Sequence, residues 1–245
     1  MEAKQFGQVT FIPGDNNGKY PYCHSLFLDG PGILIDPASN REKLLELKEN
    51  SDVREVWLSH WHEDHIMHLD LFDHLPFRIM EIDAPPLSDL DLFISSYGEI
   101  DETEKEYWRI LLKEQFHFKP RTPSSFLKDG DAFHFGGLTI EVIAAPGHTP
   151  GHIALWFKEP EVLFLADYDL TKFGPWYGDK DSSIEDTINS VRRLKKIPAK
   201  IWLTCHETGI FEEAPDALWD RYLGVIDQRE MKLLEVLKEP RENGS

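Results

Sequence analysis

The sequence has few cysteines, fewer basic than acidic residues and no long apolar run. Only Cys23 and Cys205 occur in 245 residues, and no segment near Met1 resembles a signal peptide, so we expect a cytoplasmic protein without a disulfide scaffold. The absence of about 18 consecutive apolar residues argues against a transmembrane helix. Lysine and arginine number 26 against 44 acidic residues, a formal charge of −18. This balance disfavours partners such as nucleic acid or an anionic membrane, because both attract clusters of basic side chains.

The length and apolar content are sufficient for one domain with a large core. Hydrophobic residues make up 41% of the chain, and no linker interrupts it, so we expect a single domain over residues 1–245. The chain also contains 11 histidines. Several are grouped in the sequence, and histidine is the commonest metal ligand in proteins.

Short apolar segments separated by glycine, proline and asparagine predict a protein rich in β-strands. Strands are expected at residues 8–12, 23–28, 32–35, 53–58, 77–82, 152–157, 162–166 and 200–204, with a hairpin at 132–145 that turns at Gly136-Gly137. Helices are expected at residues 41–50, about 86–118, from the segment 182–185 to the basic stretch 192–196, and roughly 216–238. Two sheets packed face to face with helices outside would accommodate this α/β pattern.

The predicted helices show one capping motif and two apolar stripes. Ser182 to Glu185 has the form of a capping box at the start of the helix that ends in the basic stretch 192–196. Leu233 and Leu237 are expected on one stripe of the last helix with other apolar residues. In the 86–118 segment, Trp108, Leu112 and Phe116 recur at four-residue spacing. Such a stripe is usually core, but the inserted helices could instead cover a site or join two subunits in a homodimer.

Three of the predicted strands end at a side chain that commonly binds metals. Residues 56–58 lead to His60, residues 163–166 to Asp167, and residues 201–204 to His206. Sites in sheet proteins covered by helices form at such strand ends. Cys205 precedes His206, and because neighbours in a strand face opposite sides, we expect a buried thiol in preference to a redox role.

The segment His60-Trp61-His62-Glu63-Asp64-His65 indicates a metal site. In an extended chain His60, His62 and Asp64 would point the same way, while His65 would follow at a turn into a helix. Histidines with a carboxylate suit zinc, iron or manganese and leave a position open for water. A further histidine, His148, lies in the tight loop Pro146–Pro150.

These motifs resemble those of the metallo-β-lactamase superfamily, most closely its glyoxalase II-like hydrolases. The resemblance covers Asp36 to His206 and implies a four-layer αββα sandwich with a helical insertion around 86–118. It implies two divalent metal ions, most simply zinc, with iron or manganese as alternatives. The implied ligands are His60, His62 and His148 for the first ion, Asp64, His65 and His206 for the second, and Asp167 as the bridge. Asp36 would support the site from behind.

The sequence departs from the family around the expected pocket. Ile66-Met67-His68 replaces the glycines that often follow the histidine motif, His206 stands in Thr204-Cys205-His206-Glu207, and the segment between His65 and His148 is long. These differences retain the ligands but leave the substrate open.

The chemistry expected from such a site is hydrolysis by a hydroxide held between two cations. Asp64 would orient the hydroxide or pass on its proton, as the catalytic residue of the site. The leading hypothesis is hydrolysis of a thioester or lactone in a small molecule. The alternatives are a di-iron redox enzyme, disfavoured by His62 where the flavodiiron branch has glutamate, and a non-catalytic binding or regulatory protein that retains metals.

Other residues near the motifs have two interpretations each. His152 is expected to fix the loop of His148 in preference to binding metal. Tyr168 could hydrogen-bond a developing oxyanion or simply pack. Trp176 and Tyr177 could form a pocket wall or ordinary surface, and His68 could lie at the surface or face the cleft.

Overall fold

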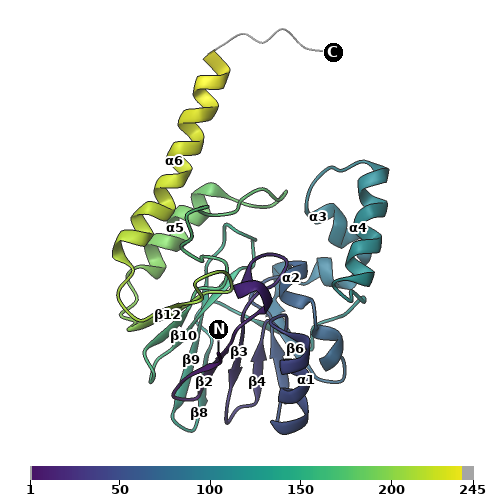
Figure 1. Cartoon of the computed structure of the whole chain (residues 1–245), viewed down its shortest axis with the longest axis vertical. Coiled ribbons are helices and arrows are strands. Elements are labelled where there is room, and N and C mark those ends of the chain that lie inside the picture. Colours follow the sequence, from purple (N-terminus) through teal and green to yellow (C-terminus); the bar gives the residue numbers. More distant parts are fainter. Residues whose placement is uncertain (1, 239–245) are drawn as a thin grey trace.

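Two β-sheets pack face to face in the computed structural model, which describes residues 2–238, and helices cover their outer faces (Figure 1). The first sheet has seven strands in the order β1-β2-β3-β4-β5-β6-β7, and the second has six in the order β13-β12-β11-β10-β9-β8. The predicted αββα sandwich is therefore confirmed.

The first sheet uses the N-terminal half of the chain. Its strands are β1 (Lys4–Phe6), β2 (Val9–Ile12), β3 (Ser25–Leu28), β4 (Ile33–Ile35), β5 (Glu55–Trp57), β6 (Phe77–Met80) and β7 (Ser125–Leu127). Strands β1 to β4 are antiparallel, whereas β4 to β7 are parallel. All three residues of β4 are buried, as expected for a strand covered on both faces.

The second sheet is mainly antiparallel. Its strands are β8 (Ala132–Phe135), β9 (Leu138–Ala144), β10 (Ile153–Phe157), β11 (Val162–Phe164), β12 (Ile201–Leu203) and β13 (Ile210–Phe211). Only β11 and β12 pair in parallel within it, so their carboxyl ends lie at the same edge. The predicted hairpin joins β8 and β9, with Gly136 at φ 50° and Gly137 at φ 102°, where residues with a Cβ are disfavoured.

Residues 2–238 contain six α-helices. They are α1 (Arg41–Asn50), α2 (Glu63–Ile66), α3 (Leu90–Ser96), α4 (Glu102–Glu114), α5 (Ile184–Leu194) and α6 (Asp216–Lys238). Figure 1 shows α5 and α6 beside the second sheet and α1 beside the first. At one end of the sandwich α6 projects beyond the sheets, and α3 and α4 rise opposite it (Figure 1). No helix within residues 2–238 is long and apolar enough to cross a membrane.

The helical insertion around 86–118 is confirmed as α3 and α4, preceded by a short 3-10 helix at Pro85–Ser88. Leu112 and Phe116 of the predicted stripe are buried in the core. Trp108 is only partly buried, so the stripe is core at its C-terminal end and open at its N-terminal end.

The apolar stripe predicted for the last helix is buried only in part. Leu233 and Leu237 follow its period but are 59% and 68% exposed, because the C-terminal half of α6 extends past the sheet (Figure 1). The buried face of α6 is made by Trp219, Tyr222 and Ile226. The cap of α5 is Ser183, not Ser182. Its side chain accepts a hydrogen bond from the backbone N–H of Asp186.

Candidate metal centre

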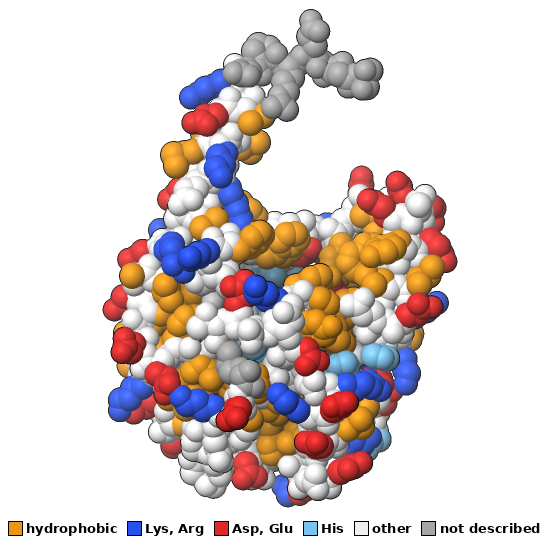
Figure 2. Space-filling view, in the orientation of Figure 1, with side chains coloured by type: hydrophobic (Ala, Val, Ile, Leu, Met, Phe, Trp, Pro, Cys, Tyr) orange, Lys and Arg blue, Asp and Glu red, His pale blue; other side chains and the backbone are white. Residues whose placement is uncertain are grey.

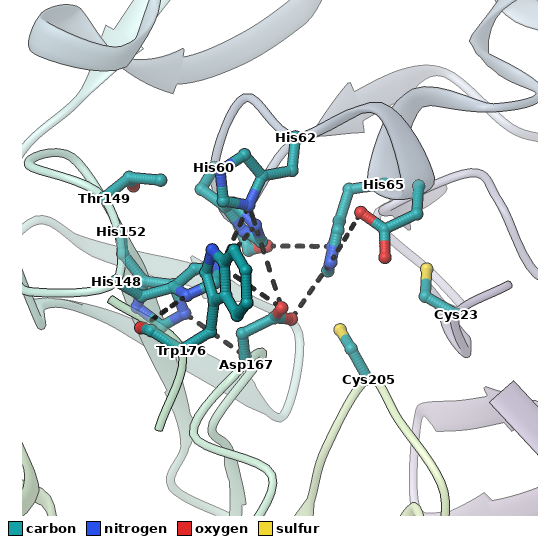
Figure 3. Close-up of polar contacts among 12 residues, drawn as sticks. Cys23, His60, His62, His65, His148, Thr149, His152, Asp167, Trp176 and Cys205 are labelled. Carbon is teal, nitrogen blue, oxygen red and sulfur yellow. Dashed lines mark hydrogen bonds and ion pairs between the residues drawn. The ribbon is translucent and has the colours of Figure 1, made fainter. Parts of the chain in front are cut away.

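The seven predicted ligands meet where the strands of both sheets end. Figure 3 shows His60, His62, His65, His148 and Asp167 of this set turned toward one another. The first sheet supplies the motif that follows β5, and the second sheet supplies the residues that follow β9, β11 and β12. The residues are His60, His62, Asp64 and His65 from the first sheet, and His148, Asp167 and His206 from the second.

The motif after β5 changes conformation in its middle. His62 is extended, with φ −61° and ψ 151°, and it is the N-cap of α2. Asp64 therefore lies in the first turn of a helix, and the expectation that it continues the extended stretch is wrong. The helix turns Asp64 away from the direction of His60 and His62 and places it beside His65. A carboxylate in this position is also stabilised by the helix dipole.

Three imidazole nitrogens point at one another in the first group. The distance from His60 Nε2 to His62 Nδ1 is 3.0 Å, and His148 Nε2 lies 3.2 Å and 2.9 Å from these two atoms. Burial lowers the pKa of His60 well below its usual value, which keeps the ring in the neutral form that binds metals. Nitrogens at this spacing fit around one cation, given metal–nitrogen distances of about 2.0–2.1 Å.

The second group combines a carboxylate with two imidazoles. His206 Nε2 lies 3.4 Å from Asp64 Oδ2, and His65 Nε2 lies 3.9 Å from Asp64 Oδ1. The ligand atoms of these three residues all lie within 4.8 Å of one another. This set can hold a second cation.

Asp167 lies between the two groups. Its Oδ1 is 3.0 Å from His65 Nε2, and its Oδ2 is 3.3 Å from His148 Nε2 and 3.4 Å from His206 Nε2. Burial would raise the pKa of Asp167, but the surrounding histidines, His65 first, lower it well below its usual value. Although Asp167 Oδ1 and His65 Nε2 lie 3.0 Å apart, neither atom makes a hydrogen bond of acceptable geometry. Buried polar atoms in this state are costly unless a cation compensates them. The donor set therefore fits two divalent metal ions.

Asp36 and His152 hold these ligands in place. Asp36 accepts a hydrogen bond from the N–H of Ser59 at 2.7 Å, and its Oδ2 lies 3.1 Å from His65 Nδ1. His152 Nδ1 is 3.1 Å from the carbonyl oxygen of Ala145, and its Nε2 accepts from the N–H of Asp167 at 3.2 Å. Asp36 therefore contacts the ring of His65, and His152 contacts the backbone of Asp167.

Cys205 is buried, as expected, and its Sγ lies behind His65, within 4.8 Å of a ring nitrogen of that residue and of Cys23 Sγ. The Sγ of Cys205 lies 3.6 Å from Asp36 Oδ2, whereas the neighbouring His206 turns its Nε2 toward Asp64 and Asp167. Burial raises the pKa of the Cys205 thiol well above its usual value. The thiol is thus kept protonated and unreactive.

Three supporting carboxylates were not predicted from the sequence, and the first two anchor ligand-bearing segments. Asp179 Oδ2 is 3.1 Å from His62 Nε2. Asp83 accepts hydrogen bonds of 2.6 Å from Thr149 Oγ1 and from the N–H of Gly151, and so fixes the loop of His148. Both acids come from loops distant in sequence from their partners, so no spacing pattern could have revealed them.

The third carboxylate belongs to Glu63, which stands between the ligands of the motif. The Tyr20 hydroxyl donates to its Oε1 at 2.8 Å, and the Tyr97 hydroxyl donates to its Oε2. Burial, followed by the charge of Asp64, raises the pKa of Glu63. Glu63 therefore joins the end of α3 to the metal motif.

A cleft of about 690 Å³ opens beside the centre. Five candidate ligands line it, namely His62, Asp64, His148, Asp167 and His206. Five aromatic side chains also line it, namely Tyr20, Tyr97, Trp108, Phe173 and Trp176. The remaining lining residues are Lys19, Glu63, Asp169, Thr171, Asp179 and Glu207. Trp176 is part of this wall, which agrees with one of its two interpretations.

Three residues suggested for the pocket lie elsewhere. The Tyr168 hydroxyl donates to the carbonyl oxygens of Ala145 and Pro146, so it packs and cannot reach an oxyanion in the cleft. The guanidinium of Arg229 lies over the ring of Tyr177, 5.1 Å from the centroid of that ring, and Tyr177 is not among the residues that line the cleft. His68 is buried near Arg41. The predictions that these three side chains face the cleft are wrong.

The fold and this arrangement of ligands define the class of αββα proteins with a dinuclear metal site. The sequence model of the metallo-beta-lactamase superfamily matches residues 21–206. The chain belongs to this superfamily, as the motifs predicted.

Several proteins of this superfamily are similar to the chain. A probable metallo-hydrolase of Streptococcus pyogenes serotype M6 is 27% identical over 199 residues, covering 78% of this chain and 77% of that protein. A hydroxyacylglutathione hydrolase of Hyphomonas neptunium is 29% identical over 194 residues, 78% of this chain and 63% of that protein. The crystal structure of a metallo-beta-lactamase family protein from Thermus thermophilus superposes with a TM-score of 0.71 at 23% identity, covering 96% and 84% of the two chains. This last likeness shows the fold.

Proposed function

We propose that the protein is a dinuclear metal-dependent hydrolase that cleaves an ester-like bond, a thioester or a lactone, in a small molecule. The observation that carries this proposal is the position of the Asp167 carboxylate, within 3.4 Å of histidines from both groups and in the wall of the cleft. The similarity to a hydroxyacylglutathione hydrolase supports acyl hydrolysis as the type of reaction.

The metals would be held by the two groups described above. Two bound divalent ions, zinc in the first instance and iron or manganese as alternatives, would supply Lewis acidity and a water of lowered pKa. Neutral imidazoles and carboxylates are suitable ligands for all three metals.

The chain's own residues would position the reactants. Asp64 lines the cleft, with its Oδ2 3.4 Å from His206 Nε2, so this oxygen can orient a water and accept its proton. Neither serine nor cysteine occurs among the described residues that line the cleft. Water is therefore the nucleophile in this proposal.

A metal-dependent assay tests the proposal. Purified protein loaded with zinc, iron or manganese in turn should hydrolyse members of a panel of thioesters and lactones, and chelation should abolish turnover. The double variant His60→Ala/His62→Ala should be inactive while remaining folded. His74→Ala/His134→Ala removes two histidines that are exposed and should retain activity. Robust turnover by the well-folded His60→Ala/His62→Ala protein would contradict the proposal.

A further inference from the structure

We propose that the cleft binds the apolar acyl group of an uncharged substrate between two aromatic walls. This inference rests on the proposed function and adds the substrate class to it. Four side chains carry it: Tyr97 and Trp108 on one wall, and Phe173 and Trp176 on the other.

Each wall is a pair of stacked rings. Tyr97 and Trp108, at the end of α3 and in α4, lie 5.0 Å apart at 22°. Phe173 and Trp176, in the loop after β11, lie 6.3 Å apart at 24°. Figure 2 shows hydrophobic side chains on both sides of the hollow between α6 and the α3–α4 pair.

The exposure of these rings indicates a binding surface. Phe173 is 58% and Trp176 is 49% exposed, although large apolar side chains gain free energy when they leave water. Contiguous apolar surface rimmed by polar residues marks binding sites in soluble proteins. An apolar ligand group would cover these rings.

The walls are held in position before any ligand arrives. The Tyr97 hydroxyl is bound by Glu63, and Trp176 Nε1 donates to Asp179 Oδ2 at 3.0 Å. Arg229 of α6 donates to the carbonyl oxygens of Pro175 and Phe173 at 2.7 and 2.6 Å, and its guanidinium lies 4.7 Å from the Phe173 ring centroid. Such preorganisation lowers the entropic cost of binding.

Both walls begin at the candidate metal ligands. The Tyr97 ring stacks on His62 with centroids 6.0 Å apart at 16°, and the carbonyl oxygen of Trp176 is 3.3 Å from His148 Nδ1. An acyl chain held between the walls would therefore place its carbonyl carbon beside His60, His62 and His148. This continuity assigns the walls to the acyl side of the scissile bond.

The charge of the cleft away from the candidate metal ligands favours an uncharged substrate. The two cations would attract an anion only near the ligands themselves. Beyond them, Glu63, Asp179 and Glu207 line the cleft, and Lys19 is the single basic residue among the described lining residues. A polyanionic thiol carrier would meet these carboxylates and a protein of net charge −18.

A series of thioesters tests the acyl part of the inference. Alkanoyl thioesters of N-acetylcysteamine, from two to eight carbons, present a growing apolar group on a neutral carrier. We expect kcat/KM to rise about fourfold for each added methylene that becomes buried. Octanoyl-coenzyme A has the same acyl group on an anionic carrier and should be hydrolysed less efficiently than the octanoyl N-acetylcysteamine thioester. A flat or falling series, or a tenfold preference for the coenzyme A thioester, would overturn the inference.

Variants of the walls locate the effect. Trp108→Ala and Phe173→Ala should each lower kcat/KM for the octanoyl thioester about tenfold more than for the acetyl thioester, and Trp108→Phe should restore part of the loss. Tyr107→Ala removes a ring from the adjacent, exposed position of α4, outside the lining, and should change neither. If kcat/KM fell equally for both thioesters in folded, metal-replete variants, the rings would have a structural role and the inference would be wrong.

A binding measurement separates this inference from the proposed function. Octanamide, a neutral amide, should change the tryptophan fluorescence of the wild type and bind about tenfold more weakly to Phe173→Ala. Octanamide binding without hydrolysis of any thioester or lactone would contradict the hydrolase assignment but retain the apolar site. Hydrolysis without octanamide binding would retain the hydrolase assignment but contradict the apolar site.

Discussion

The Nε2 atom of His62 lies 3.1 Å from Asp179 Oδ2, on the side of the ring opposite to Nδ1, which faces His60 and His148. A carboxylate beside Nε2 favours the tautomer of His62 with its proton on that nitrogen, which leaves the Nδ1 lone pair free for a metal. The hydrogen bond with His62, together with its charge, also lowers the pKa of Asp179 despite burial.

Removing this carboxylate should weaken metal binding. We expect Asp179→Ala to lower zinc affinity about 10- to 100-fold, because His62 loses the partner that fixes its orientation, and Asp179→Asn to have a smaller effect. Competition with a chromophoric chelator measures the affinity. Asp181→Asn, at an exposed position two residues away, is the matched control, and equal affinities for the Asp179 and Asp181 variants would refute the role.

Metal removal should destabilise the fold. The candidate ligands converge only in the native structure, so zinc at about 100 times its dissociation constant should add about 2.7 kcal/mol to the free energy of unfolding. Thermal unfolding with and without a chelator checks this. His206→Ala should reduce the zinc-dependent increase, and an unchanged melting temperature of the wild type on chelation would count against the site.

Asp83 should give the protein a specific pH dependence. Burial raises the pKa of Asp83 from 3.8 to about 6, so the folded state binds the proton more tightly than the unfolded chain. Its contribution to stability is therefore present below about pH 4 and is lost as the pH rises to about 6. The loss amounts to roughly 3 kcal/mol, at 1.36 kcal/mol per pKa unit.

The asparagine variant isolates this contribution. Urea unfolding of the chelated wild type and of Asp83→Asn, at pH values from 4 to 7, gives the difference in unfolding free energy. The wild type should lose stability relative to the variant between pH 4 and 6, and the difference should be constant above that range. Parallel curves throughout would show that Asp83 titrates normally.

Gly174 should be required for the position of the Phe173–Trp176 wall. Its φ is +80°, and a Cβ there would lie 2.6 Å from Cβ of Val225 in α6. Gly130 has nearly the same φ, +81°, with nothing within 4 Å, so Gly130→Ala measures the backbone cost alone, about 1–2 kcal/mol. Gly174→Ala should lose a further 1–3 kcal/mol through the clash. Urea unfolding compares the two, and equal losses would contradict the packing of this loop on α6.

The sequence was sufficient to predict the layers and the set of side chains that gather at the candidate metal centre, because both depend on local patterns. The His60–His65 motif and the strands that end before Asp167 and His206 are contiguous signals, and a strand end fixes where the next side chain lies. The division of these residues into two groups came only from the family resemblance, because the spacing alone placed Asp64 with His60 and His62. The expected extended geometry of Asp64 was wrong because α2 begins at Glu63.

Other features depend on contacts between segments distant in the sequence. Asp179 and Asp83 act on loops far from their own positions, and Tyr168 turns toward the carbonyl oxygen of Pro146 instead of the cleft. Loop conformation decides these contacts, and no periodic pattern encodes it. Leu233 follows the apolar period of α6 but lies where the helix has left the sheet, so the pattern was correct and the packing was absent.

The division of the ligands between the two sheets has a consequence for biosynthesis. A nascent chain that has emerged only as far as β8 carries the whole His60–His65 motif but lacks His148, Asp167 and His206. The first group is complete once His148, after β9, has been made, but the second group lacks His206, and the centre lacks Asp167, until translation has passed β11 and β12. Binding of two ions would therefore be a late event, in which the finished polypeptide, not the growing one, competes for the ions available in the cell.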